Sequence, residues 1–184
     1  MKRTFVSTDA EATEALGEAL GQHLPAGTVM TLDGDLGTGK TTLVRGLGRG
    51  LGLDEPISSP TYMLMQAYEG GRVPLYHFDA WMEGREKALL ADGADEFLGA
   101  GGIAVVEWGS RVLDWLPEPR LEVTLGHRSP EERTISMAVI GGPGPLGAAL
   151  EAVLERLGTP GAVAGLVPRE NGHPSEPPGA PSVS

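Results

Sequence analysis

The spacing of apolar residues along the chain predicts alternating helices and strands. The segment "STDAEATEALGEALGQHL" opens with the N-cap pattern Thr8-x-x-Glu11 and continues with apolar residues at helical spacing, so it is predicted to be a helix that ends at Pro25. The apolar segment "GTVMTLDG" is predicted to be a strand. Residues 41–51 carry their large apolar residues on one side, which indicates a second helix.

Later segments predict further strands. "TYMLMQAYEGGRVPLYHFD" is typical of two strands joined by a turn at Gly70-Gly71, and "GGIAVVEW" of a buried strand because its apolar run is continuous. "RLEVTLGH" and "RTISMAVI" alternate and are expected to pair across "RSPEE". Residues 85–91 and 146–157 are expected to be helical. This order predicts an α/β fold with a mostly parallel central sheet, antiparallel additions and flanking helices.

Length and composition restrict the class of protein. The 184 residues suit one domain, expected over residues 1–158, followed by a Pro-, Gly-, Ala- and Ser-rich tail, residues 159–184, that is predicted to be disordered. The chain has no cysteine, which excludes disulfides, zinc–cysteine sites and thiol catalysis and agrees with a cytoplasmic protein. No apolar run approaches the roughly 20 residues of a membrane helix, so no membrane association is expected.

The charge balance argues against direct binding of nucleic acid. Acidic residues outnumber basic ones 25 to 14, which gives a net charge of −11. A surface that binds phosphate backbones is basic. Stable binding of RNA or DNA by this chain alone is therefore not expected.

The segment "LDGDLGTGKTTLVRG" matches the P-loop pattern G-x-x-x-x-G-K-S/T at every fixed position, between an apolar strand and an amphipathic helix. Glycine allows the backbone amides to surround an anion at the positive end of the helix. Lys40 can contact the β- and γ-phosphates, and the Thr41 hydroxyl can bind Mg²⁺. The alternative is a turn that caps a helix and leaves Lys40 on the surface. The predicted phosphate-binding residues are Gly34, Asp35, Leu36, Gly37, Thr38, Gly39, Lys40, Thr41 and Thr42.

Two carboxylates at predicted strand ends are candidates for metal binding or catalysis. Asp79 ends "LYHFD" and Glu107 ends "GIAVVE", where each side chain can reach a site above the strand tips. The alternatives are an aspartate that caps a turn and a glutamate that merely leaves the core. In "SSPTY", Thr61 can sense the γ-phosphate, although a simple Ser/Pro turn is the other interpretation. His77 is either a base or a packed core residue.

Four separated segments, "GDLGTGKTTLVRGL", "SSPTY", "HFDAW" and "VVEW", resemble the TsaE (YjeE) family of bacterial P-loop ATPases in order and spacing, over about residues 5–140. The resemblance implies a P-loop NTPase-like fold and a role in making threonylcarbamoyladenosine beside the anticodon of tRNAs that read codons starting with A. It also implies ATP and Mg²⁺ as cofactors and slow ATP hydrolysis, mainly in complex with the TsaD and TsaB proteins. Contact with tRNA would then be indirect, and the chain alone would be a monomer or self-associate weakly.

The resemblance also implies roles for individual residues. Residues 37–42 would bind phosphates, Thr41 and Glu107 would hold Mg²⁺, and Asp79 would be a functional carboxylate. Adenine would lie near residues 7–11, which include Thr8, and Arg133 would reach the nucleotide, while Thr61 would belong to a switch. The chain departs from the family pattern at Met82, where an arginine is usual, and at Ser110, where the second carboxylate of "EWPE" is missing.

Two other functions fit a P-loop. A small-molecule kinase would need a lid with arginines, but Arg85 and Lys87 are the sole basic residues between Asp79 and Glu107. An ATP-gated binding module with negligible turnover would fit the lack of an arginine near "SSPTY". The sequence has no N-K-x-D signature of GTPases, so ATP is expected rather than GTP.

Overall fold

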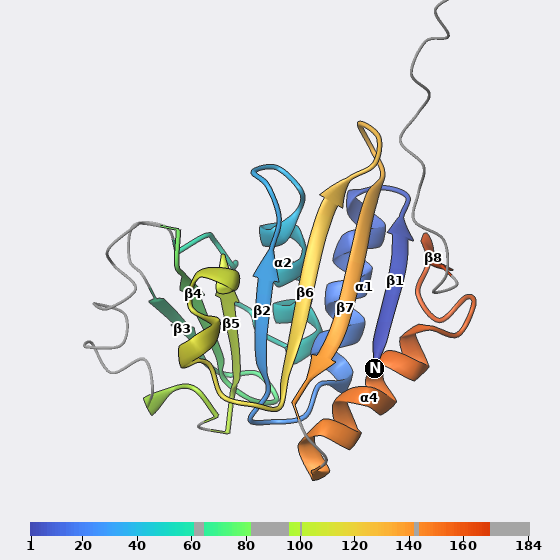
Figure 1. Ribbon diagram of the computed structural model, residues 1–184. Helices are drawn as coiled ribbons and strands as arrows, with labels where there is room; N and C mark the ends of the chain where they lie inside the picture. Colours follow the sequence, from blue (N-terminus) through green and yellow to red (C-terminus); the bar gives the residue numbers. More distant parts are fainter. Residues whose placement is uncertain (61–64, 82–95, 100, 142–143, 170–184) are drawn as a thin grey trace, which may run out of the picture.

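The computed structural model describes residues 1–60, 65–81, 96–99, 101–141 and 144–169, and a mixed β-sheet runs through this part of the chain (Figure 1). Its strands are β1 (Lys2–Ser7), β2 (Val29–Asp33), β3 (Met65–Tyr68), β4 (Leu75–Asp79), β5 (Ile103–Glu107), β6 (Arg120–His127), β7 (Arg133–Ile140) and β8 (Leu166–Arg169). Among the described residues these eight strands follow the spatial order β3-β4-β5-β2-β6-β7-β1-β8.

The centre of the sheet is parallel and both flanks are antiparallel. Strands β4, β5, β2 and β6 pair in parallel. Strand β3 pairs antiparallel with β4 across a connection that contains Gly70 and Gly71, and β6 and β7 form the second predicted hairpin. The predicted α/β fold is therefore confirmed, with larger antiparallel flanks than expected. Because β2, β4 and β5 are parallel, their carboxyl ends meet at one edge of the sheet, where such folds bind ligands.

Helices cover one face of this sheet. They are α1 (Ala10–His23), α2 (Lys40–Leu51) and α4 (Pro145–Leu157), which agree with three predicted helices. Residues 85–91, the fourth predicted helix, lie outside the described residues. The apolar faces of α1, α2 and α4 pack on inward-facing strand residues such as Met30, Leu32 and Val105 to form the main core. No helix in the described part of the chain is long and apolar enough to span a bilayer.

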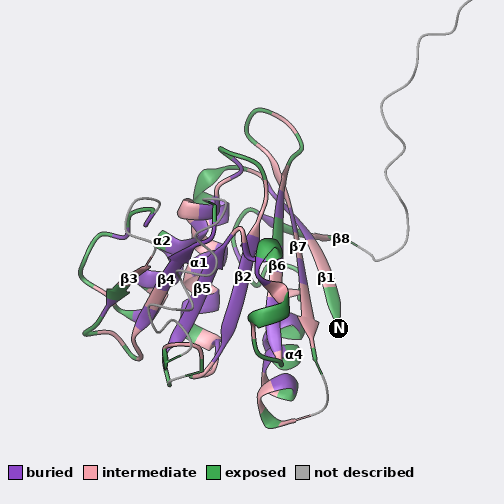
Figure 2. Ribbon diagram, turned by 60° about the vertical axis from the view of Figure 1, so that its left-hand side comes forward, coloured by how far each residue is buried: buried purple, intermediate pink, exposed green. Residues whose placement is uncertain are grey.

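The opposite face is covered by residues 96–99 and by two short 3₁₀ helices, η2 (Gly109–Arg111) and η3 (Leu113–Trp115). Side chains alternate along each strand, so Val29 and Phe78 point to this second, smaller core, whereas their sequence neighbours point to the helices. Burial on both faces makes the central strands almost entirely purple in Figure 2. It also explains why "GIAVVE" is a continuous apolar run.

Asp9, rather than the predicted Thr8, is the N-cap of α1. The Asp9 backbone is extended, and its Oδ1 accepts a hydrogen bond of 2.7 Å from the amide of Ala12. The Thr8 hydroxyl donates instead to Asp9 Oδ2 and to the carbonyl of Gly165. Ser7, Thr8 and Asp9 all have suitable side chains, so the sequence pattern alone did not distinguish them.

Replacing Asp9 with alanine is expected to lower the free energy of unfolding by about 1 kcal/mol, because the amide of Ala12 loses its partner. The predicted capping box would make Glu11→Ala equally costly, whereas the structure assigns Glu11 no capping contact with Thr8 among the described hydrogen bonds. Urea unfolding of both variants measures the difference. Equal losses would contradict Asp9 as the cap.

Regular structure continues beyond residue 158, where the sequence predicted that the domain ends. Beyond α4, strand β8 pairs antiparallel with β1, and the Gly165 carbonyl accepts a hydrogen bond from the Thr8 amide. The prediction of disorder from residue 159 is therefore wrong for residues 159–169. Two apolar side chains in this Pro- and Gly-rich stretch, Val163 and Leu166, are buried in the main core. The backbone of β8 also forms a ladder with the edge of β1 that β7 does not occupy. Residues 170–184 lie outside the described residues.

Candidate nucleotide-binding site

A tight loop, residues 34–39, connects the carboxyl end of β2 to α2 at the top of the sheet in Figure 1. Gly34 has φ of 140° and a Cβ there would lie 2.3 Å from the carbonyl oxygen of Leu125, so this position requires glycine. The amide and hydroxyl of Thr38 both donate to the Asp35 carbonyl and close the loop. No side chain caps the start of α2, whose first amides therefore face the loop opening. This arrangement suits an anion.

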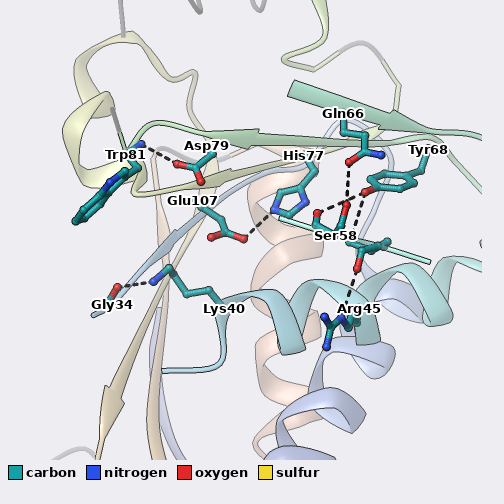
Figure 3. Close-up of polar contacts among 11 residues, drawn as sticks. Gly34, Lys40, Arg45, Ser58, Gln66, Tyr68, His77, Asp79, Trp81 and Glu107 are labelled. Carbon is teal, nitrogen blue, oxygen red and sulfur yellow. Dashed lines mark hydrogen bonds and ion pairs between the residues drawn. The ribbon is translucent and has the colours of Figure 1, made fainter. Parts of the chain in front are cut away.

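Lys40 is buried in the loop rather than exposed on the surface. Its side chain reaches back so that Nζ donates to the carbonyls of Gly34 at 2.6 Å and Asp35 at 3.1 Å, and it lies 4.2 Å from the centre of the Trp108 ring (Figure 3). Burial lowers the pKa of Lys40, while the negative charges of Glu107 and Asp79 act in the opposite direction. The alternative of a turn with a surface lysine is excluded, because Lys40 is only 6% exposed.

Asp79 and Glu107 lie side by side opposite this lysine. They are register partners at the ends of the parallel strands β4 and β5, and their exposed fractions are 4% and 3%. Asp79 Oδ1 accepts a hydrogen bond of 2.7 Å from the Trp81 amide, and Glu107 Oε1 lies 2.9 Å from Nε2 of His77. Figure 3 shows both carboxylates directed toward the space above Lys40. Asp79 thus caps a turn, as one interpretation held, and also faces the site.

These groups line one cavity of about 350 Å³. Thr41 and Thr42 contribute from the first turn of α2, and the loop contributes its glycines. The lining residues are Leu36, Gly37, Gly39, Lys40, Thr41, Thr42, Ser59, Asp79, Trp81, Glu107 and Trp108. Backbone amides, an ammonium, a hydroxyl and two carboxylates form the donor and acceptor set that a metal-bound polyphosphate needs.

The donor set fits Mg²⁺ held jointly with phosphate. No cluster of three or more His, Cys, Asp or Glu in the described part of the chain forms a metal site made by the protein alone. Mg²⁺ does not need one, because it keeps several waters and uses one or two carboxylates together with substrate phosphates. Thr41, Asp79 and Glu107, which share the cavity, match that requirement.

A second cavity of about 500 Å³ adjoins the first on the other side of the loop. The two share Gly37, Gly39 and Thr42, and the second extends to the start of α1 and to the β6–β7 hairpin. Its lining residues are Asp9, Ala10, Thr13, Gly37, Thr38, Gly39, Thr42, Pro130, Glu131 and Arg133. Arg133 Nη1 donates to the carbonyls of Ser129, Pro130 and Glu132, so this arginine also shapes the hairpin. The Thr8 hydroxyl is engaged by Asp9 and Gly165.

Some residues of the site were not predicted from sequence. Asp33, at the end of β2, accepts a hydrogen bond of 3.0 Å from the Ser110 amide and acts electrostatically on Lys40. Its position just before the P-loop was the available signal. Trp108 has φ of 58°, and its ring centre lies 4.4 Å from that of Trp81 with the two ring planes tilted by 51°. Thr61 and Met82 lie outside the described residues.

Comparisons with known proteins show which family the chain is similar to. A family model described as "Threonylcarbamoyl adenosine biosynthesis protein TsaE" matches residues 7–135. The tRNA threonylcarbamoyladenosine biosynthesis protein TsaE of Bacillus subtilis is 35% identical over 136 residues, which cover 73% of this chain and 84% of the relative. The protein of the same name from Nostoc is 42% identical over 128 residues, covering 68% and 78%. The crystal structure of YdiB from Bacillus subtilis matches with a TM-score of 0.69 at 28% identity, covering 84% of this chain and 95% of that one.

Proposed function

The chain belongs to the TsaE family, and from this premise we propose that it is an ATP-binding and ATP-hydrolysing accessory subunit in tRNA threonylcarbamoyladenosine biosynthesis. The observation that carries the ATPase proposal is the single cavity that joins the P-loop with Lys40, Asp79 and Glu107. Membership of the family supports a role in this biosynthesis.

In the proposed complex the triphosphate follows the loop and the base occupies the second cavity. The amides of residues 36–42 and the Lys40 ammonium neutralise the phosphates. The base lies between the start of α1 and the β6–β7 hairpin, where Arg133 is placed to contact the nucleotide. Because Gly37, Gly39 and Thr42 line both cavities, one elongated ligand can extend from the first cavity into the second.

The catalytic part of the proposal assigns Thr41, Asp79 and Glu107 to Mg²⁺ and to the attacking water. When bound, Mg²⁺ neutralises charge that develops on the phosphates. Asp79 and Glu107 hold hydrogen-bonded water at the γ-phosphate end, and Glu107 polarises the water that attacks. Thr61 belongs to the segment that responds to loss of the γ-phosphate. The described residues offer no second basic side chain beside Lys40 among those lining the first cavity, so slow turnover by the chain alone is expected.

The proposed partners are the TsaD and TsaB proteins, whose transferase the ATPase would reset or regulate, in the cytoplasm. The net charge of −11 disfavours direct binding of tRNA by this chain. Leu36 is 73% exposed and Trp81 is 40% exposed, and both lie on the rim of the first cavity. Exposed apolar side chains beside a ligand site support a protein contact there.

The proposal is tested by calorimetric titration with Mg-ATP and Mg-GTP and by ATP turnover with and without the TsaD–TsaB pair. We expect ATP to bind, GTP to bind more weakly, and the pair to stimulate release of inorganic phosphate. Absence of ATP binding refutes the proposal. Binding without stimulated turnover supports instead the nucleotide-gated binding module, and transfer of phosphate to a metabolite rather than to water supports a kinase.

A further inference from the structure

His77 is an imidazole in the middle of the buried strand β4. It is 0% exposed, and its register partners are Gln66 on β3 and Val105 on β5. Its Nε2 lies 2.9 Å from Glu107 Oε1 (Figure 3). An ionised carboxylate can only accept a hydrogen bond, so Nε2 carries the ring hydrogen and donates it to Glu107.

The other ring nitrogen of His77 is not stabilised by a hydrogen bond at this position. Nδ1 is buried and has no hydrogen-bond partner among the described residues. An unpartnered buried polar atom costs stability, which an aliphatic side chain in the same strand avoids. Leu75, two residues earlier on the same face of β4, is also fully buried and is such an aliphatic side chain. Core packing therefore does not explain a histidine here, whereas the contact with Glu107 does.

We infer that His77 is a positioning residue that fixes the Glu107 carboxylate at the wall of the first cavity, an inference that rests on the proposed function. Glu107 has several rotatable bonds, and the rigid β4 backbone holds the imidazole in one place beside it. One carboxylate oxygen is then engaged by Nε2, and the other serves the cavity. Hydrogen-bond partners of this kind orient groups at metal sites.

Two polar substitutions separate this role from a structural one. His77→Gln places an amide nitrogen near the position of Nε2, whereas His77→Asn reaches only to the position of Nδ1. The Mg²⁺ concentration that gives half-maximal enhancement of ATP binding is measured by calorimetry, with ATP binding in excess EDTA as the metal-free reference. We expect this half-maximal Mg²⁺ concentration to rise about tenfold in His77→Asn and to change by less than about threefold in His77→Gln. Metal-free ATP affinity should be unchanged in both.

Glu107→Gln provides the matched control. Adding His77→Asn to Glu107→Gln should produce no further loss of the Mg²⁺ response, because the two residues act as one unit. His77→Leu should lose the Mg²⁺ response as His77→Asn does, because an aliphatic side chain offers Glu107 no hydrogen-bond donor.

The outcomes distinguish this inference from the proposed function. A native chain whose ATP binding does not respond to Mg²⁺ overturns the proposed function and the inference with it. If ATP binding by the native chain responds to Mg²⁺, and His77→Asn and His77→Gln respond equally, only the inference is overturned. Additive effects of His77→Asn and Glu107→Gln on the Mg²⁺ response also overturn only the inference.

Discussion

Replacing Lys40 with alanine is expected to lower the affinity for Mg-ATP by about 100-fold, which corresponds to about 3 kcal/mol. The ammonium would contribute charge-assisted contacts to two phosphate groups, which are stronger than neutral hydrogen bonds. Its loss also removes the positive charge that faces four carboxylates, Glu107, Asp79, Asp33 and Asp35. The cavity would then repel the polyphosphate. Calorimetric titration of the native chain and the variant measures the loss.

The same variant is expected to remain folded. In the native chain, the cost of desolvating the Lys40 ammonium offsets the stability gained from its hydrogen bonds to Gly34 and Asp35 and from its contact with Trp108. We expect the free energy of unfolding to change by less than about 1 kcal/mol, while the rise in melting temperature with saturating Mg-ATP disappears. Lys2→Ala, at an exposed position of β1, is the charge-matched control and should bind normally. Equal ATP affinity of Lys40→Ala and the native chain would refute phosphate binding by the loop.

The sequence predicted the position of the P-loop in the fold well because the constraints on this segment are local. Glycine spacing, the lysine and the following helix are read within one segment, and the structure places them as expected between β2 and α2. Asp79 and Glu107 were predicted because parallel strands bring their carboxyl ends to one edge. The side-chain partners across strands, such as His77 with Glu107, depend on register, which the sequence does not specify.

Predictions failed where short segments derive their structure from distant ones. Strand β1 was missed because "KRTFVS" is a brief pattern after a charged start, and it is fixed by pairing with β7 and β8. Strand β8 was assigned to a disordered tail because its composition resembles one, and it is fixed by pairing with β1. Neither partner is adjacent in sequence, so local propensity could not identify these strands.

Close contact between α1 and α2 is a further feature that the sequence pattern had not revealed. Each helix carries glycines four residues apart, Gly17 and Gly21 on α1 and Gly46 and Gly50 on α2. A Cβ on any of them would lie 1.9 to 2.2 Å from a backbone carbonyl oxygen of the other helix, which no alternative side-chain rotamer could relieve. The helix that begins with Lys40 is thus held directly against the helix whose start lines the second cavity.

Replacing Gly46 with alanine is therefore expected to lower the free energy of unfolding by about 2–3 kcal/mol, although alanine favours an isolated helix by about 1 kcal/mol. The added Cβ would lie 1.9 Å from the Glu14 carbonyl oxygen, so the two backbones must separate. Gly48→Ala is the matched control in the same helix, because its Cβ would meet the movable tip of Ile57 and should cost less than about 1 kcal/mol.

Urea unfolding compares the two variants, and ATP titration shows whether the disturbance reaches the site. Separation of the helices shifts the start of α1 relative to the loop, so Gly46→Ala should also weaken ATP binding more than Gly48→Ala. Because both substitutions add one methyl group to the same helix, a difference between them reports the backbone contact and not helix propensity. Equal stability of the two variants would show that the helices have room to separate and that their contact does not hold the P-loop in place.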